Sequence, residues 1–172
     1  MLDLTSLMFN RENDGDELRY GPSRTENSGS QRKPVVVFNL IRDCNLECVH
    51  CYSGSRRKRF PGQLGTETIL ETLRDLKDFD VPAVLLSGGE PLVHPDFDRI
   101  LETVGELDLR VTVSTNGTLI DEDQARKLAE SPVRYVGISL DGLDELNDEF
   151  RGVDGAFDRA VRGIENCKAV DQ

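Results

Sequence analysis

The chain has 172 residues, of which 32 are acidic and 21 basic, so its formal net charge is −11. This length suits one domain with a core and excludes a disulfide-stapled miniprotein, and the negative charge argues against a general nucleic-acid binder. Arginine outnumbers lysine by 16 to 5. An acidic surface with little lysine favours a protein from a halophile, and the alternative is an ordinary acidic cytosolic protein.

No apolar run approaches the ~20 residues that a helix needs to span a bilayer. The first nine residues have no basic flank, so a signal peptide is not expected. We therefore expect a cytoplasmic protein whose four cysteines are reduced. In that compartment cysteines indicate metal binding or catalysis before disulfides.

The chain is predicted to consist of two parts. Residues 1–33 are a polar N-terminal arm, partly disordered, because residues 10–33 contain few apolar side chains. Residues 34–172 form the core domain. Within it, the near-continuous apolar run at residues 35–40 predicts a first strand that is buried on both faces of a parallel sheet.

Four amphipathic helices and three further strands are expected to follow in alternation. The strands are predicted at residues 83–86, 110–113 and 135–140. Thr66, Asp121 and Asp154 are the expected N-caps of the first, third and fourth helices, and Pro95 is expected in the first turn of the second. This order predicts an α/β fold with a parallel sheet and right-handed crossovers, in a barrel or a doubly wound arrangement.

Each predicted strand ends in a polar or glycine-rich motif. These motifs are a cysteine loop, Ser87-Gly-Gly-Glu-Pro91, Ser114-Thr-Asn-Gly117 and Ser139-Leu-Asp-Gly142. Ligands of parallel α/β folds bind at the carboxyl ends of the strands. The four motifs therefore predict one composite site at that edge of the sheet.

The cysteine loop places Cys44, Cys48 and Cys51 within eight residues. Thiolates are soft ligands for zinc or for iron–sulfur clusters. A tetrahedral zinc site needs a fourth ligand, but His50 lies between two of the cysteines and Cys167 falls on the core stripe of a helix. Three thiolates suit a cubane cluster whose fourth iron stays open.

The C-x3-C-x2-C spacing resembles the signature of the radical S-adenosylmethionine (SAM) superfamily. The resemblance implies that the three cysteines hold a [4Fe–4S] cluster whose unique iron chelates the amino and carboxylate groups of SAM. An electron from the cluster then cleaves SAM to a 5′-deoxyadenosyl radical, which abstracts hydrogen from the substrate. It also implies an incomplete (βα)6-type partial TIM barrel, of which about four βα units are present.

The same resemblance implies a set of cofactor-binding residues. They are His50, Gly88, Gly89, Glu90, Ser114, Asn116, Ser139, Asp141 and Arg151. Glu90 is expected either to accept from the SAM ammonium or to hold its turn in place, Arg151 to pair with the carboxylate, and His50 to pack near the adenine. Plain alternatives are an Asn-Gly turn for Asn116, an Asx-turn for Asp141 and a solvated surface position for Arg151.

Longer runs resemble the haem-biosynthesis branch of that superfamily, which includes the didecarboxysiroheme deacetylase and a related haem synthase. These runs lie at residues 33–55, 84–92, 113–120, 135–142 and 147–170, with a weaker similarity at residues 18–21. The branch implies a siroheme-derived tetrapyrrole substrate, an electron donor such as ferredoxin or flavodoxin, and neither a nucleic acid nor a membrane as partner. The cations at residues 56–59 are expected either to clamp substrate carboxylates or to form a solvated loop.

The superfamily core normally has six βα units, so we expect this chain to be the N-terminal part of an enzyme: a fragment, a split protein or a truncated reading frame. Because a partial barrel leaves a strand edge unpaired, a second chain that completes the barrel is one predicted kind of partner. Two other functions remain open. One is a peptide-modifying maturase of the same superfamily, and the other is a non-catalytic remnant or interaction module that holds a cluster or zinc.

Overall fold

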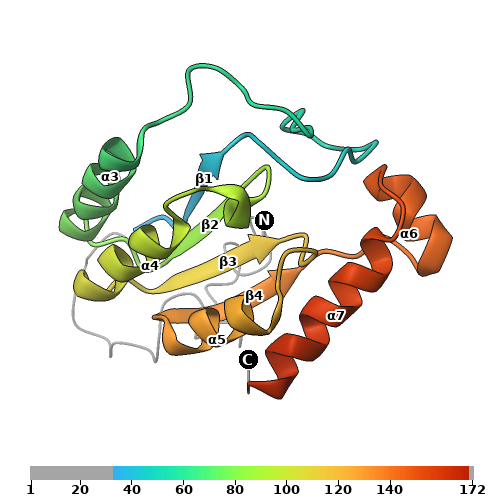
Figure 1. The fold of residues 1–172 in the computed structure, drawn as a ribbon. Helices are drawn as coiled ribbons and strands as arrows, with labels where there is room; N and C mark the ends of the chain where they lie inside the picture. The colour runs from blue at the N-terminus through green and yellow to red at the C-terminus, as the bar shows by residue number, and fades with distance from the viewer. Residues whose placement is uncertain (1–32, 171–172) are drawn as a thin grey trace, which may run out of the picture.

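A computed structural model describes residues 33–170 of the chain. Nearly all of the expected N-terminal arm, including residues 18–21, lies outside the described residues. Four parallel strands form one sheet in the order β1-β2-β3-β4, comprising β1 (Val36–Ile41), β2 (Val84–Gly88), β3 (Val111–Thr115) and β4 (Val133–Ile138). Helices connect them (Figure 1). The predicted α/β fold of about four units is therefore confirmed.

The described helices are α3 (Thr66–Asp78), α4 (Phe97–Glu106), α5 (Glu122–Glu130), α6 (Asp144–Arg151) and α7 (Ala156–Ala169), with a short 3-10 helix η1 (Pro91–Val93). Helix α6 was not expected. Between residues 33 and 170, no helix is long and apolar enough to cross a membrane.

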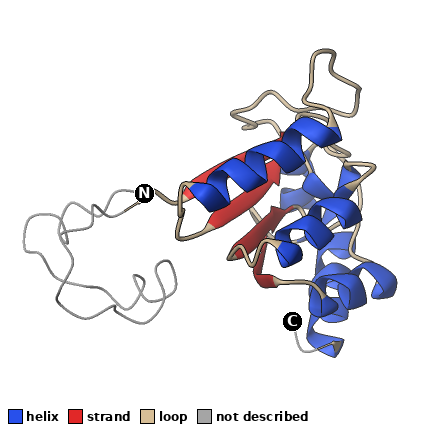
Figure 2. Cartoon of the chain, turned by 90° about the vertical axis from the view of Figure 1, so that its left-hand side faces the viewer, coloured by secondary structure: helices blue, strands red, loops and turns tan. Residues whose placement is uncertain are grey.

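The core lies on one face of the sheet, where the helices gather (Figure 2). Leu40, Leu86 and Val113 point into it and are at most 2% exposed. The opposite face is open, with Val37 56% and Tyr135 66% exposed. The expectation that the first strand is buried on both faces is therefore wrong, because β1 alternates between a helix-covered face and an uncovered one.

The helix starts are only partly as predicted. Asp121 is the N-cap of α5, and its side chain accepts from Gln124 N–H at 2.8 Å. Thr66 is not a cap, since Gly65 holds that place and the Thr66 hydroxyl donates to Asp96 instead. Helix α4 begins two residues after Pro95, with Asp96 as N-cap.

The N-cap of α7 is Gly155 rather than Asp154. The carboxylate of Asp148, which lies in α6, accepts from Gly155 N–H and from Phe157 N–H. These bonds lower the pKa of Asp148, led by the one from Phe157 N–H. A side chain from the preceding helix thus stabilises the start of α7, an interaction that no local sequence pattern predicts.

Candidate cofactor site at the strand ends

A cavity of about 460 Å³ lies at the carboxyl ends of the four strands. It brings together every predicted site residue except Glu90. Its lining includes Cys44, Cys48, Cys51, His50, Gly88, Gly89, Ser114, Asn116, Ser139, Asp141 and Arg151. The expected composite site is therefore present as a geometric feature.

The cysteine loop leaves β1 and reaches across toward α6 (Figure 1). Cys44 is anchored by its N–H, which donates to the Arg56 carbonyl at 3.1 Å. Burial raises the pKa of its thiol to about 11. The Leu46 N–H group donates to the sulfur and lowers the pKa, whereas the charges of Glu90, Cys48 and Cys51 add to the increase. In the apo chain Cys44 is therefore a neutral thiol at pH 7.

Cys51 behaves in the opposite way. Partial burial works to raise its pKa, but hydrogen bonds from the Ser53 side chain and from the main chain of Ser55, Ser53 and Gly54 outweigh it, so the pKa is lowered. The Ser53 hydroxyl lies 3.3 Å from the sulfur. The surroundings of Cys51 therefore stabilise its thiolate, the form that binds metal, whereas those of Cys44 do not.

Two glycines let the cysteine loop pass against the end of β2. Gly88 has φ +150°, and a Cβ there would collide with the main-chain oxygen of Ile41. A Cβ on Gly89 would collide with the carbonyl oxygens of Asp43 and Arg42. Gly89 N–H instead donates to Ile41 O at 2.6 Å and Glu90 N–H to Asp43 O at 3.0 Å. The two glycines therefore allow the close main-chain contact that fixes the loop carrying Cys44 against the end of β2.

Glu90 is fully buried beside this contact, with 0% exposure. One carboxylate oxygen accepts from the Thr115 hydroxyl at 2.7 Å and from Leu92 N–H at 3.1 Å, and the other accepts from Asn116 N–H at 2.8 Å. Burial raises the pKa of the Glu90 carboxyl, and this effect outweighs the three donors, which lower the pKa. Of the two expected roles of Glu90, holding the turn is the one that these contacts supply.

Asn116 closes the end of β3. Its side-chain oxygen accepts from Thr118 N–H at 2.9 Å, which is an Asx-turn, and its amide donates to Asn45 at 2.8 Å. The same amide lies 4.0 Å from the Cys44 sulfur. Asn116 therefore ties the end of β3 to the cysteine loop.

Arg151, at the end of α6, is 9% exposed and faces the cavity. Its Nη2 pairs with Asp141 at 2.8 Å and its Nη1 lies 3.8 Å from the Cys48 sulfur. Its Nε is buried and has no partner among the described residues. His50 Nε2 lies 3.4 Å from the same Asp141 carboxylate, and its ring is 5.8 Å from that of Phe150.

The donor set can be tested against the two metal groups that the sequence left open. Among residues 33–170, no group of three His, Cys, Asp or Glu side chains is close enough to hold a single ion. A tetrahedral zinc would bring thiolates to roughly 4 Å from one another, given Zn–S bonds of about 2.3 Å. A cluster spreads its ligands over several irons, so three separated thiols around one cavity fit a cluster better.

Sequence reasoning missed the supports of the site that come from α6. Asn147 is 1% exposed and its side-chain oxygen accepts from Asp141 N–H at 3.0 Å. The main-chain oxygens of Phe150 and Arg151 accept from Val49 and Glu47. The available sequence signals were Gly152, a glycine at the usual place just after a helix end, and the helical spacing of Leu146 and Phe150.

The cationic run at residues 56–59 divides into two parts. The guanidinium of Arg56 donates to the carbonyls of Ser55, at 2.7 Å, and Cys48, at 3.5 Å, so it braces the loop. Arg57, Lys58 and Arg59 are exposed and do not line the cavity. Within the run, Lys58 Nζ lies 4.9 Å from the centre of the Phe60 ring, and Arg57 and Arg59 are the exposed arginines that face solvent.

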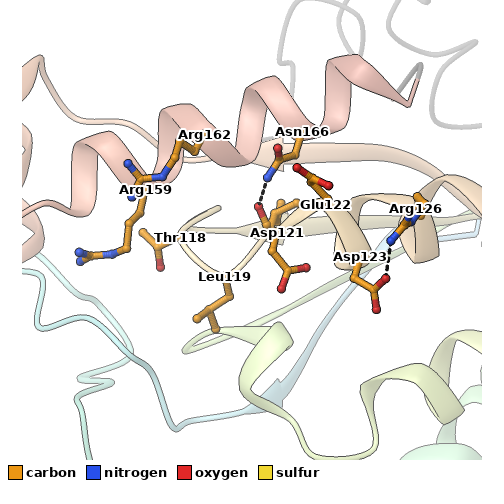
Figure 3. A pocket seen from close by; sticks show the side chains of 10 residues that line it. Thr118, Leu119, Asp121, Glu122, Asp123, Arg126, Arg159, Arg162 and Asn166 are labelled. Carbon is orange, nitrogen blue, oxygen red and sulfur yellow. Dashed lines mark hydrogen bonds and ion pairs between the residues drawn. The ribbon is translucent and has the colours of Figure 1, made fainter.

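A second, larger cavity of about 730 Å³ lies between the start of α5 and α7 (Figure 3). Arg126 there pairs with Asp123 at 2.6 Å, and the Asn166 amide donates to Ile120 O at 2.9 Å. Arg159 and Arg162 line it from α7. No predicted site residue contributes to its described lining.

A sequence profile described as the Radical SAM superfamily matches residues 38–172. The chain belongs to this superfamily. Its members are enzymes that bind a [4Fe–4S] cluster and SAM, in agreement with the cofactors expected from the cysteine loop. The SAM-bound crystal structure of SuiB from Streptococcus suis covers 82% of this chain with 30% identity and a TM-score of 0.69, and the match spans 33% of SuiB.

Among curated relatives, the Fe-coproporphyrin III synthase of Methanosarcina barkeri is 43% identical over 98% of this chain and 44% of its own length. The pre-heme d1 synthase of Dinoroseobacter shibae is 43% identical over 94% of the chain and 40% of its length. The mycofactocin maturase MftC of Mycobacterium tuberculosis is 41% identical over 78% of the chain and 34% of its length. The chain thus spans less than half the length of these relatives.

Proposed function

We propose that this chain forms the cluster- and SAM-binding part of an enzyme that modifies a siroheme-derived tetrapyrrole in haem biosynthesis. The observation that carries the proposal is the meeting of three thiols and a buried arginine in one cavity at the strand ends. Cys44, Cys48 and Cys51 are assigned as cluster ligands. When bound, the cluster and SAM supply a 5′-deoxyadenosyl radical for hydrogen abstraction.

The chain's own residues bind and orient SAM in this proposal. Arg151 brings a buried positive charge with an unpartnered Nε, which suits the carboxylate of SAM. Gly88 and Gly89 line the cavity with main chain and are assigned to the amino group of SAM. Ser114 and Ser139 supply hydroxyls, and the Asp141 carboxylate is assigned to a ribose hydroxyl. His50, held between Asp141 and Phe150, offers a ring face to the adenine.

The cofactor part of the proposal is tested by anaerobic reconstitution of the chain with iron and sulfide. We expect about four irons per chain, a change in the cluster's spectrum when SAM is added, and formation of 5′-deoxyadenosine under reducing conditions. Ferredoxin or flavodoxin is the proposed class of physiological donor. Bound zinc with no response to SAM would contradict the proposal and support the non-catalytic alternative.

The tetrapyrrole part rests on the names of two relatives that are each 43% identical to the chain, and on the exposed cations beside the cysteine loop. Arg57 and Arg59 are free of the bracing contacts made by Arg56, so they are the residues to change. We expect Arg57→Gln with Arg59→Gln to weaken binding of a carboxylated tetrapyrrole by roughly 10-fold. SAM cleavage should be unchanged.

Arg74→Gln, at an exposed position on α3, is the matched control. Equal tetrapyrrole affinity in the double variant, the control and the parent chain would remove these cations from the substrate site.

A peptide-modifying maturase is the second candidate, because the mycofactocin maturase is 41% identical over 78% of this chain. The two candidates differ in substrate rather than in cofactor. Quenching of tetrapyrrole fluorescence or a shift of its absorption on mixing with the reconstituted chain favours the first. A complex with a short precursor peptide, without any tetrapyrrole response, favours the second.

A further inference from the structure

The last turn of α6 is joined to the cysteine loop by main-chain hydrogen bonds. Glu47 N–H donates to Arg151 O at 3.0 Å, and Val49 N–H donates to Phe150 O at 2.9 Å. The last four carbonyls of a helix have no partner within the helix. Here two of them are satisfied by the residues on either side of Cys48, so α6 fixes the main chain around this cysteine.

Gly152 makes this contact sterically tight. It ends α6 in the left-handed region, with φ +68° and ψ 22°. A Cβ at this position would lie 2.5 Å from Glu47 O and 3.0 Å from Glu47 C. Both are main-chain atoms, so the loop itself would have to move to make room.

The side chains of α6 strengthen the same connection. Arg151 Nη1 lies 3.8 Å from the Cys48 sulfur, while its Nη2 pairs with Asp141 at 2.8 Å. Asn147 accepts from Asp141 N–H at 3.0 Å. Helix α6 thus holds the end of β4 and the middle of the cysteine loop together.

The other two cysteines have main-chain anchors that do not involve α6. Cys44 is held by Arg56 O and, through Asn116, by the end of β3. Cys51 is held within its own turn, with its N–H donating to Cys48 O at 3.3 Å and its sulfur against Ser53. Cys48 is the one of the three whose flanking residues are bonded to α6.

We propose that Gly152 is a positioning residue for the cluster: the close approach that it permits places Cys48 relative to Cys44 and Cys51. The proposal rests on the assignment of these cysteines as cluster ligands, but the position of Cys48 is also measurable without a cluster. Supports of metal ligands commonly change metal affinity by about 10- to 100-fold when they are altered.

The chain offers a matched control at Gly155. Its φ of +69° and ψ of 15° are nearly those of Gly152, so an alanine there meets the same backbone strain. A Cβ at Gly155 would lie 3.1 Å from Arg159 Nη1, the end of a flexible side chain, and would meet no part of the cysteine loop. Comparing the two alanine variants therefore separates backbone strain from the collision with Glu47.

The first measurement uses the cluster-free chain. Alkylation of each cysteine is followed by mass spectrometry under native conditions. We expect Gly152→Ala to raise the rate at Cys48 by roughly 10-fold relative to the parent chain, with Cys44 unchanged and with Gly155→Ala like the parent. An equal rate at Cys48 in the parent and in both variants would overturn the proposal.

The second measurement uses the reconstituted chain. Gly152→Ala should bind iron roughly 10-fold more weakly and should show an altered electron paramagnetic resonance spectrum of the reduced cluster, with and without SAM. Gly155→Ala should match the parent in both. If Gly152→Ala matches the parent as well, Gly152 does not position the cluster.

If the proposed function is wrong, the parent chain itself takes up no cluster. The alkylation rates still show in that case whether Gly152 positions Cys48. Should Gly152→Ala not fold, Gly152→Asn and Gly155→Asn replace the pair. Asparagine tolerates the left-handed region and keeps the Cβ that meets Glu47.

Discussion

The two cavities differ in what surrounds them more than in how large they are. The cavity between α5 and α7 has about 730 Å³, against about 460 Å³ for the one at the strand ends. Yet Asp121 and Asp123 of the larger cavity are already engaged with Gln124 N–H and Arg126 on their own helix. The Arg126–Asp123 ion pair is exposed and contributes little stability, and Asp121 serves as the N-cap of α5.

The smaller cavity is bordered by segments from all four strand ends and from α6. It combines three thiols with a buried guanidinium whose Nε lacks a partner in the described part of the chain. Volume therefore does not identify the site. What identifies it is the convergence of unlike functional groups, each held by contacts with a different strand end or helix.

Removing the thiols gives the largest expected difference between the cavities. We expect Cys44→Ala, Cys48→Ala or Cys51→Ala to bring the iron content from about four per chain toward zero, because each would remove a cluster ligand. Cys167→Ala is the control, since this cysteine is 5% exposed in the core beneath the sheet. Iron and sulfide analysis after anaerobic reconstitution measures the effect, and a full cluster in any of the first three variants would contradict the ligand assignment.

Neutralising one arginine in each cavity sharpens the comparison. Arg151→Gln removes the buried charge and the ion pair with Asp141, so SAM affinity should fall by roughly 10- to 100-fold. Arg162→Gln, on the wall of the larger cavity, should leave it unchanged. Isothermal titration with SAM measures both, and equal affinities would mean that the smaller cavity does not hold the SAM carboxylate.

Much of this site was accessible from the sequence because its residues follow apolar strands. The apolar runs before Ser87 and Ser114, and the predicted strand at residues 135–140, indicate both the strands and the edge at which their polar ends meet. The fourth strand, β4, ends at Ile138, so Ser139 follows it rather than lying inside it. Cys167 was also predicted correctly as a core residue, since it falls on the apolar stripe of α7.

Helix α6 could not be found in this way. Its apolar side chains Leu146 and Phe150 are 52% and 39% exposed, whereas its buried side chains are Asn147 and Arg151. Leu146 and Phe150 are four residues apart, as on one face of a helix, but that face is turned away from the core. The helix is held by polar contacts to a loop about 100 residues earlier, and a local sequence pattern does not report such contacts. The role of Glu90 was undecided for a related reason, because its donors Thr115 and Asn116 come from the next strand.

Two carboxylates extend the comparison to stability. Glu90→Gln leaves one of three buried donors without an acceptor, so the free energy of unfolding should fall by about 1–3 kcal/mol. Glu122→Gln, on an exposed carboxylate that lines the larger cavity, should change it little. Urea unfolding at pH 7 measures both, and an equally small effect at Glu90 would mean that its contacts do not support the turn.

Asp148 joins the two regions, since it lies in α6 beside the smaller cavity and accepts from the start of α7, which lines the larger one. Hydrogen bonds from Phe157 and Gly155 lower its pKa, so the folded state favours the carboxylate. Its contribution to stability is therefore present above the ordinary pKa of about 3.9 and is lost as the pH falls through the lower folded value. Asp148→Asn should lower the melting temperature by roughly 2–4 °C at pH 7.

The difference between Asp148→Asn and the parent chain should shrink below about pH 4, because the unfolded parent then takes up a proton at Asp148 and, at still lower pH, the folded carboxylate is protonated too. Asp154→Asn is the control, and it also tests the cap position that the sequence favoured: with Gly155 as the N-cap, this change should have little effect at any pH. Thermal unfolding followed by circular dichroism from pH 3 to pH 7 compares the three chains. A larger loss from Asp154→Asn than from Asp148→Asn would mean that the start of α7 is held locally, and that α6 does not connect the two cavities.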